Sequence, residues 1–359
     1  MHLTHQTFYR FSGFHSLLIG ILPFFIPVLL WEREGSLVTI SAFIAFTGIG
    51  FMLALYCWDR LRLSQHWRLI VLLSFFAELL LVAALVWHID ATFLLGLALL
   101  NGVYNCFYWS TQRALFSHIT GEHNTGKTFG NFQILVTVLL KLGILIGGYL
   151  LQERAETGLM FLSLLIVSIA LWFLIRPADK VSESHSLAQI PAIGAPEPAL
   201  DLRQVSRFRD TNQSRLVFLL DGPFLFMESY FWVLSLYFLA QRNFFTLGLI
   251  VVILALLLSV LFFLIKNKID RANQQNVFLI ATLLYAFSWF LRGLIHPEDA
   301  ELIIYPLILL IAFLTGFFRL AFNKRFFDLA KNQAPNRYIV CKSYYSQFGI
   351  TLFFGLLAI

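Results

Sequence analysis

Apolar residues follow one another along most of this chain in runs that are long enough to cross a lipid bilayer. A transmembrane helix needs about 20 apolar residues, and about eleven runs of this kind are present. They lie near residues 11–30, 36–57, 67–88, 91–112, 127–151, 157–175, 214–240, 243–265, 274–294, 301–322 and 339–359. The runs are continuous, which excludes the alternating pattern of membrane β-strands. The pattern predicts an all-α polytopic membrane protein, because helices satisfy their own backbone groups in hydrocarbon.

Composition and charge narrow the class of protein further. Hydrophobic residues make up 59% of the 359 residues and charged residues 13%, whereas a soluble domain carries about 25% charged residues. The net charge of +6 does not indicate a nucleic-acid partner, because cytoplasmic loops of membrane proteins are enriched in Lys and Arg. Cys57, Cys106 and Cys341 are far apart in the sequence and predict no metal or redox site. We expect a chain surrounded by lipid, with no cofactor and no nucleic acid.

Lys and Arg residues are concentrated in alternate loops, and this predicts the orientation of the chain. If the amino terminus is cytoplasmic, the loops on the cytoplasmic side contain most of these residues. The outer loops then contain Arg33, Arg154, Arg242 and little else. An excess of Lys and Arg is typical of short cytoplasmic loops. We therefore expect the amino terminus to lie in the cytoplasm. We also expect a monomeric integral protein of a bacterial inner membrane.

A polar segment separates two halves of the chain. Residues 177–213 are rich in Pro, Ala and Ser and contain no run of membrane length, which is typical of a linker. The last part of this segment, "DLRQVSRFRD", is either a short basic helix on anionic lipid or a merely solvated stretch. The prediction is an amino-terminal six-helix bundle at 1–176, a cytoplasmic linker at 177–213 and a carboxy-terminal bundle at 214–359.

The two halves contain similar features at similar positions. Three pairs are displaced by 211, 214 and 215 residues, and they are Asp59-Arg60 with Asp270-Arg271, Gly102 with Gly316, and Lys127 with Lys342. Unrelated coincidences would not agree so closely, so we infer that one six-helix unit is used twice. Repeated halves around a site at the bilayer midplane are common in secondary transporters.

The loop after the second run resembles the signature of the major facilitator superfamily, roughly Gly-x-x-x-Asp-Arg-x-Gly followed by basic residues. Asp59 and Arg60 match its Asp-Arg pair, and Arg68 is a downstream basic residue. Leu55 and Arg62 stand where the two glycines are expected. With the layout of two halves and a linker, the resemblance covers nearly the whole chain and implies two six-helix bundles related by a pseudo-two-fold axis. Members have twelve spans, so we expect either a truncated sequence or an absent twelfth helix.

The resemblance also implies a role for the charged loop. In the superfamily this loop acts as a cytoplasmic latch, whose aspartate meets helix ends and basic residues of the opposite half in one state only. A carboxylate is favoured beside arginine and near a helix amino terminus. The latch residues implied here are Asp59, Arg60, Asp270 and Arg271. The alternative is that these charges only mark the cytoplasmic side of the membrane.

Seven ionisable residues lie within the expected spans, where insertion of a charge costs about 2.5–3.5 kcal/mol. They are His15, Glu78, Lys141, Asp221, Glu228, Arg292 and Arg319. The resemblance implies that spans one, four, seven and ten line the cavity, and four of the seven residues are on these spans. Glu78 and Lys141 are expected in structural pairs. Arg292 is expected to extend its charged end toward the outer surface.

Two carboxylates on the seventh span are the strongest candidates for coupling groups. Asp221 and Glu228 are seven residues apart and therefore share one helix face. Gly222-Pro223 predicts a kink or an unwound turn, and broken helices mark binding sites in transporters. A carboxylate in the membrane interior can take up and release a proton, so both are predicted to couple transport to protons or another cation. The alternative is a buried ion pair with Arg319 or Lys141.

Polar and aromatic side chains on four spans predict the lining of a substrate cavity. A row on the fourth span lies within an arc of about 100°, and it either lines the cavity or bonds neighbouring helices. On the tenth span, Arg319 either binds an anionic group or holds a carboxylate of the seventh span. The predicted lining residues are His15, Asn101, Tyr104, Asn105, Tyr108, Gln112, Trp232, Thr315 and Arg319.

These features together predict a secondary active transporter that moves a small organic solute by alternating access, coupled to protons. The first alternative is a non-transporting receptor or assembly protein on the same scaffold. The second is a membrane-embedded transferase, whose catalytic cluster would have to be "HPEDAE" at residues 296–301. No Gly-rich phosphate loop and no metal-ligand spacing accompany that segment, so the sequence argues against an enzyme.

Overall fold

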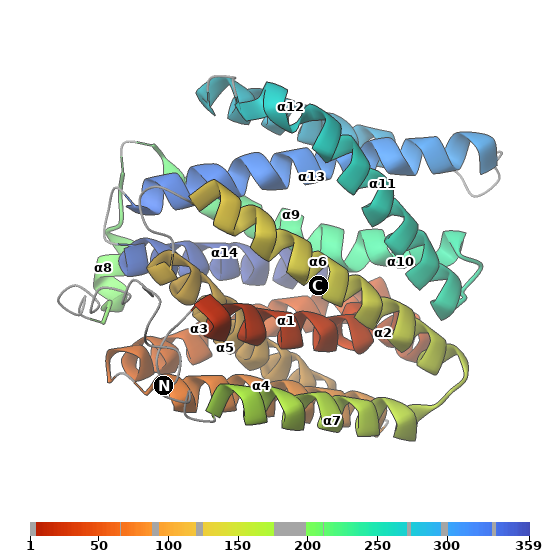
Figure 1. Ribbon diagram of the computed structural model, residues 1–359, viewed down its shortest axis with the longest axis horizontal. Coiled ribbons are helices and arrows are strands. Elements are labelled where there is room, and N and C mark those ends of the chain that lie inside the picture. Colours follow the sequence, from red (N-terminus) through yellow and green to blue (C-terminus); the bar gives the residue numbers. More distant parts are fainter. Residues whose placement is uncertain are drawn as a thin grey trace, which may run out of the picture.

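The structure is a computed structural model, and it describes residues 5–64, 66–87, 93–119, 125–175, 199–210, 212–270, 274–295, 301–331 and 335–359. Helices account for nearly all of these residues, and the described part of the chain contains no strand. The helices lie roughly along one direction and pack side by side (Figure 1). The all-helical fold predicted from the apolar runs is confirmed.

The first half of the chain begins with a broken helix. Its two parts, α1 and α2, are bent by 43° around the short 3-10 turn η1, which starts at Pro23. Proline removes a backbone donor and so favours such a break. The elements of this half are α1 (His5–Ile21), η1 (Pro23–Phe25), α2 (Ile26–Glu34), α3 (Leu37–Leu63), α4 (Trp67–Val86), α5 (Leu94–Ile119), α6 (Thr125–Gln152) and α7 (Glu156–Ile175).

The second half begins with a short helix before the seventh span. This helix, α8, lies within the last part of the predicted linker, whereas residues 176–198 lie outside the described residues. The elements are α8 (Leu202–Ser206), α9 (Ser214–Phe226), the π-helical segment η4 (Met227–Trp232), α10 (Val233–Leu239), α11 (Phe244–Asp270), α12 (Gln274–Arg292), α13 (Glu301–Lys331) and α14 (Pro335–Leu357). The division into 1–176, 177–213 and 214–359 stays a prediction.

Each of the eleven apolar runs corresponds to one helix or to one interrupted helix. Among the described residues, seven helices are long and apolar enough to cross a membrane, or eight if the bent pair α1 and α2 is one span. The helix α12 is a shorter apolar helix, while α5 and α14 reach 26 and 23 residues with more polar side chains. The protein is therefore an integral membrane protein.

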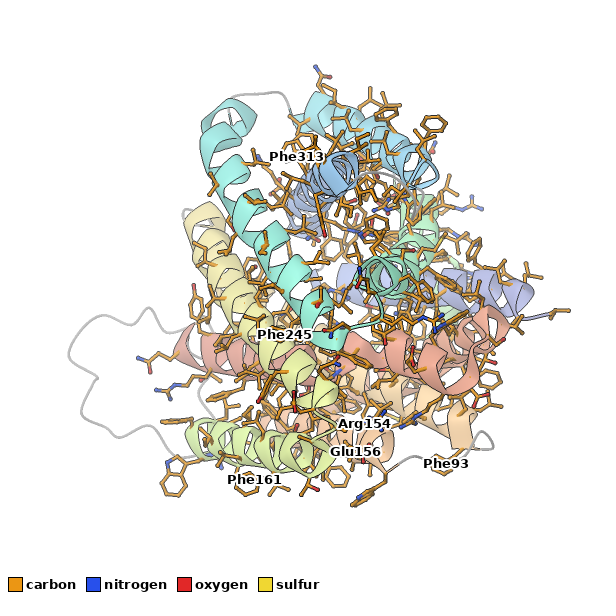
Figure 2. The ribbon with its side chains drawn as sticks, turned by 90° about the vertical axis from the view of Figure 1, so that its right-hand side faces the viewer. Phe93, Arg154, Glu156, Phe161, Phe245 and Phe313 are labelled. Atoms are coloured by element: carbon orange, nitrogen blue, oxygen red, sulfur yellow. The ribbon has the colours of Figure 1, made fainter. Side chains whose placement is uncertain are left out.

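Large apolar side chains cover the outer faces of these helices. Phe161 on α7 is 68% exposed, and Phe245 at the start of α11 is 41% exposed. Figure 2 shows both among the side chains that project from the ribbon, with the charged side chains of Arg154 and Glu156 near the turn between α6 and α7. An apolar surface of this extent fits contact with lipid rather than water.

Close helix packing brings the two halves together at the centre of the molecule. A Cβ atom on Gly48 of α3 would collide with Thr351 of α14, and one on Gly222 of α9 would collide with the backbone of Ser346. Small residues allow such approaches in membrane helices. In Figure 1, α9, α10 and α14 lie between α12 and α13 on one side and α1, α3 and α5 on the other. Polar residues on α9 and α14 therefore lie deep within the bundle.

Candidate functional site

The seventh span carries the centre of the site, and its irregular segment is a π-helix. We expected a kink or an unwound turn at Gly222-Pro223, but α9 continues through Pro223 to Phe226, and the change in helix type begins at Met227. The helix is therefore not unwound at the Gly-Pro pair, and the irregular segment begins four residues after Pro223. The Gly-Pro pair lies where α9 and α14 pack closely. Gly349 of α14 approaches the carbonyl of Leu219, four residues before Pro223, so closely that it has no room for a Cβ atom. Pro223 has no N–H to bond that carbonyl.

The π-helical segment contains Glu228, Tyr230 and Trp232. π-helical turns are rare and are frequent at functional sites. The wider turn separates these side chains from the regular register of α9, and it directs Glu228 toward the tenth span and Tyr230 toward the fourth, as their hydrogen bonds show. No feature of the apolar pattern indicated this change of helix type.

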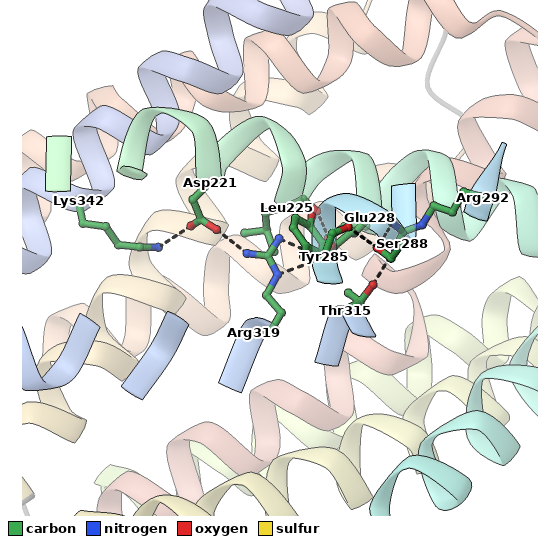
Figure 3. Close-up of polar contacts among 10 residues, drawn as sticks. Asp221, Leu225, Glu228, Tyr285, Ser288, Arg292, Thr315, Arg319 and Lys342 are labelled. Atoms are coloured by element: carbon green, nitrogen blue, oxygen red, sulfur yellow. Dashed lines mark hydrogen bonds and ion pairs between the residues drawn. The ribbon is translucent and has the colours of Figure 1, made fainter. Parts of the chain in front are cut away.

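Arg319 of α13 joins the two carboxylates of the seventh span. Its Nη1 donates to Oδ1 of Asp221 over 2.5 Å, and its Nε and Nη2 donate to Oε2 of Glu228 over 3.1 and 3.0 Å. Lys342 of α14 lies 3.3 Å from Oδ2 of Asp221. Figure 3 shows the four side chains in a row along α9. Arg319 and Lys141 were the two basic residues considered as partners of these carboxylates, and Arg319 is the one that makes the contacts.

Burial makes these contacts strong and makes the loss of one of them costly. The Asp221 side chain is 3% exposed, Glu228 is 12% exposed and Arg319 is 20% exposed. Charge-assisted hydrogen bonds from a planar guanidinium are stronger than neutral ones. An unpaired charge in such surroundings is unfavourable. The row is therefore a compact ion cluster that joins α9, α13 and α14 and remains partly open at Glu228 and Arg319.

Arg292 of α12 extends the polar row beyond Glu228. Its Nη1 donates to Oγ of Ser288 over 3.1 Å, and its Nη2 donates to Oγ1 of Thr315 over 2.8 Å. The guanidinium also lies 4.2 Å from the ring centroid of Trp289 and 5.1 Å from that of Trp232. The expectation that Arg292 extends outward is wrong, because its partners lie deeper in the bundle than its own backbone. Figure 3 shows Arg292, Ser288 and Thr315 beside Glu228.

The polar row of the fourth span bonds two other helices through Asn101, while its other hydrogen bonds among the described side chains lie within α5. Asn101 Nδ2 lies 3.2 Å from Oγ1 of Thr47 on α3 and 3.2 Å from the hydroxyl of Tyr230 on η4. Asn105 donates to Oδ1 of Asn101 over 3.0 Å. The rest of the row is buried, namely Tyr104, Tyr108 and Gln112, and Gln112 donates to the Tyr108 hydroxyl. The contacts fit the helix-bonding alternative, and cavity lining by this row stays a prediction.

His15 and Glu78 form a separate cluster inside the first half. His15 Nδ1 lies 2.6 Å from Oε2 of Glu78, its Nε2 lies 3.0 Å from Oγ of Ser74, and both side chains of the pair are fully buried. The imidazole stacks on Phe75 with the ring centroids 3.9 Å apart. Both residues were candidates from the sequence, but 63 positions separate them and no local pattern pairs them. The structure does not bring His15 to Asp221 or Glu228.

The charged residues expected in a loop lie in the last turns of α3 and contact the segment before α8. Asp59 Oδ1 accepts from Arg62 over 2.7 and 3.1 Å, while its Oδ2 accepts from the backbone N–H of Leu200 over 3.0 Å. Arg60 is exposed and stacks on Tyr56 at 3.3 Å. Arg62, which replaces a signature glycine, is thus the residue that holds Asp59. The Asp270 side chain and Arg271 lie outside the described residues.

Comparisons with known proteins agree with this architecture. A model of the Major Facilitator Superfamily matches residues 11–354. The crystal structure of a single-residue mutant of the nucleoside transporter NupG is similar, with a TM-score of 0.64 and 13% identity over 99% of this chain and 89% of that chain. No curated protein matches. The side-chain clusters described above thus lie in a membrane transporter for a small molecule and not in an enzyme, and the chain belongs to the major facilitator superfamily.

Proposed function

We propose that this protein is a proton-coupled secondary active transporter that moves a small organic solute by alternating access. The observation that carries the proposal is the ion cluster of Asp221, Arg319, Glu228 and Lys342, which joins three helices deep in the bundle. Ionisable groups within the membrane mark ion and substrate pathways. The aromatic and hydroxyl groups beside the cluster suit a solute with both apolar and polar parts.

Glu228 is the proposed proton-binding group. It shares Arg319 with Asp221, while Asp221 has Lys342 as a second partner. A proton on Glu228 removes the negative charge that Arg319 contacts and weakens that link between α13 and the seventh span. Asp221 keeps two cationic partners and therefore stays ionised. The coupling step is thus the making and breaking of the Glu228–Arg319 contact, with Asp221 as the fixed partner.

Several contacts would have to change when the two halves move. The hydrogen bond of Asn101 with Tyr230 joins the fourth and seventh spans, and Asp59 binds Leu200 at the predicted cytoplasmic side. We propose that Asp59 and Arg60 belong to a latch at this end, together with Asp270 and Arg271 of the second half. The proposal includes a cytoplasmic amino terminus, a bacterial inner membrane and a monomer without nucleic acid.

NupG is a nucleoside transporter by its description, and at 13% identity this likeness supports the fold and leaves the solute to be argued from the site. The alternative of a non-transporting receptor on the same scaffold lacks a contact that favours it. Transport itself is therefore the property to be measured first.

The test is uptake into proteoliposomes with an imposed pH gradient. Labelled sugars, nucleosides and organic acids are offered to the parent protein and to Glu228→Gln, with protein-free vesicles as the baseline. We expect gradient-driven accumulation of at least one compound by the parent, and at least a tenfold smaller gradient-driven rate in Glu228→Gln, with exchange of the same compound preserved. If the parent accumulates none of the compounds, or the variant accumulates its substrate as the parent does, the proposal is wrong.

A further inference from the structure

Two cations near the ion cluster, Arg113 and Arg292, form no ion pair within the described residues, and Arg292 is the one that lies beside Glu228. Asp221 and Glu228 together bind Arg319, and Lys342 binds Asp221. Within the described residues, Arg292 forms no ion pair, and its Nη1 and Nη2 atoms donate to the neutral hydroxyls of Ser288 and Thr315. Its Nε atom is buried without a hydrogen-bond partner in the described structure.

The guanidinium of Arg292 faces the inside of the protein. On α12, Ala281, Tyr285 and Ser288 are buried and recur at helical spacing, and Arg292 follows Ser288 by four residues on the same face. Its partner Thr315 lies 14 residues after the start of α13, which is about 21 Å along the helix. The charge is therefore near the middle of the membrane and not at its surface.

The charges of the cluster do not cancel at this position. Two carboxylates face four cations, which leaves an excess of two positive charges among these described side chains; the cations are Arg113, Arg292, Arg319 and Lys342. A charge at this depth costs about 2.5–3.5 kcal/mol on insertion scales. An anion brought by a ligand would offset that cost. A guanidinium offers a planar fork that matches a carboxylate or a phosphate.

Two tryptophan rings lie beside the guanidinium of Arg292. The rings of Trp232 and Trp289 have their centroids 5.1 and 4.2 Å from its Cζ atom. They come from η4 and α12, so the guanidinium lies between two helices that carry indole side chains. Thr315 accepts a hydrogen bond from Arg292 and has its own O–H as a donor. The combination offers two donors for an oxyanion and aromatic surfaces for an apolar group.

We propose that the solute is an organic anion whose carboxylate or phosphate binds Arg292 and Thr315, with its apolar part against Trp232 and Trp289. The inference rests on the proposed transport function and names the substrate class of that site. Arg319, the other candidate for anion binding, is already occupied by two carboxylates. The anion and the coupling proton on Glu228 then bind on adjacent helices.

The test compares compounds that differ only in charge. Thermal unfolding of the purified full chain is measured in phosphatidylcholine nanodiscs with benzoate or benzamide, uridine monophosphate or uridine, and glucose 6-phosphate or glucose. We expect at least one anion, and not its neutral counterpart, to raise the unfolding temperature, with an apparent Kd at least tenfold weaker in Arg292→Gln. Arg242→Gln is the matched control, because Arg242 is an exposed arginine that also contacts an aromatic ring. Thr315→Val, which keeps the charge, is expected to weaken the same anion about threefold.

Three results of the unfolding assay with these compounds would overturn the inference. The first is binding of the neutral compounds only, and the second is equally tight anion binding by the parent and by a folded Arg292→Gln or Thr315→Val variant. The third is no binding of any anion. Phosphatidylglycerol is also added to the nanodiscs without any solute. If it raises the unfolding temperature of the parent but not that of Arg292→Gln, Arg292 binds a lipid headgroup and the inference is also overturned. Gradient-driven uptake of a neutral compound would leave the transport proposal standing while the anion inference fails.

Discussion

Two buried polar clusters lie in the two halves of this transporter, and they differ in burial and in the balance of charge. The cluster of His15, Glu78 and Ser74 is sealed, with both members of the His-Glu pair fully buried. The cluster around Arg319 connects three helices, carries more positive than negative charge with Arg292 included, and remains partly exposed at Glu228. A closed pair is suited to holding helices together, whereas an open and unbalanced cluster is suited to binding ions and solutes.

The helices that each cluster joins support this difference. His15 of α1 and Glu78 of α4 both belong to the first half, and their contact crosses no boundary between the halves. Arg319 and Lys342 come from α13 and α14 and meet on the interrupted seventh span. That span also contacts the first half through Tyr230 and Asn101. A change of charge at Glu228 is therefore able to reach both halves, and a change at Glu78 is not.

The largest expected effect comes from Arg319→Gln, which breaks the open cluster. Two carboxylates then lose their shared partner in the membrane interior, and removal of one member of a buried ion pair costs about 3–5 kcal/mol. We expect a clear fall in the unfolding temperature and no gradient-driven uptake. The measurement is thermal unfolding in nanodiscs together with uptake in proteoliposomes, and Arg242→Gln serves as the exposed control. Parent-like stability and uptake would mean that the cluster has no part in folding or transport.

A smaller effect is expected from Glu78→Gln, which changes the sealed pair. The amide preserves the shape of the side chain but weakens its hydrogen bonding with His15, and an imperfectly satisfied buried group costs about 1–3 kcal/mol. We expect a modest fall in the unfolding temperature and an unchanged dependence of uptake on the pH gradient, per folded molecule. A stable Glu78→Gln protein that has lost gradient-driven uptake would reverse the comparison and place the proton site in the first half.

The fold and part of the site were predictable because they depend on local pattern. Apolar run length predicted each membrane helix, and the spacing of seven residues placed Asp221 and Glu228 on one face, where Arg319 contacts both. The partners were not predictable, since 98 and 91 positions separate Arg319 from the two carboxylates. Hydropathy reports how apolar a segment is and carries no information about which charged residues of different helices meet.

Three further features depended on packing that no single segment encodes. The direction of Arg292 is decided by hydroxyls on α12 and α13 rather than by its distance from the outer loop. The π-helical segment begins four residues after Pro223, where the sequence favoured a break at the proline itself. Lys342 was noted only as part of a repeat, although it is a direct partner of Asp221.

The central claim, that the two halves move around the seventh-span cluster, is tested most directly by distances between spin labels in proteoliposomes. With Cys57 replaced, one pair of labels at Val38 and Leu302 spans the proposed outer side, and a second pair at Leu69 and Leu216 spans the cytoplasmic side; all four positions are exposed. When a proton gradient is imposed across the vesicle membrane, we expect the two distances in the parent to change in opposite directions, and we expect Glu228→Gln to hold one of the two states with and without the gradient. Distances that stay the same on both sides, or that change equally in Glu228→Gln and the parent, would contradict the account.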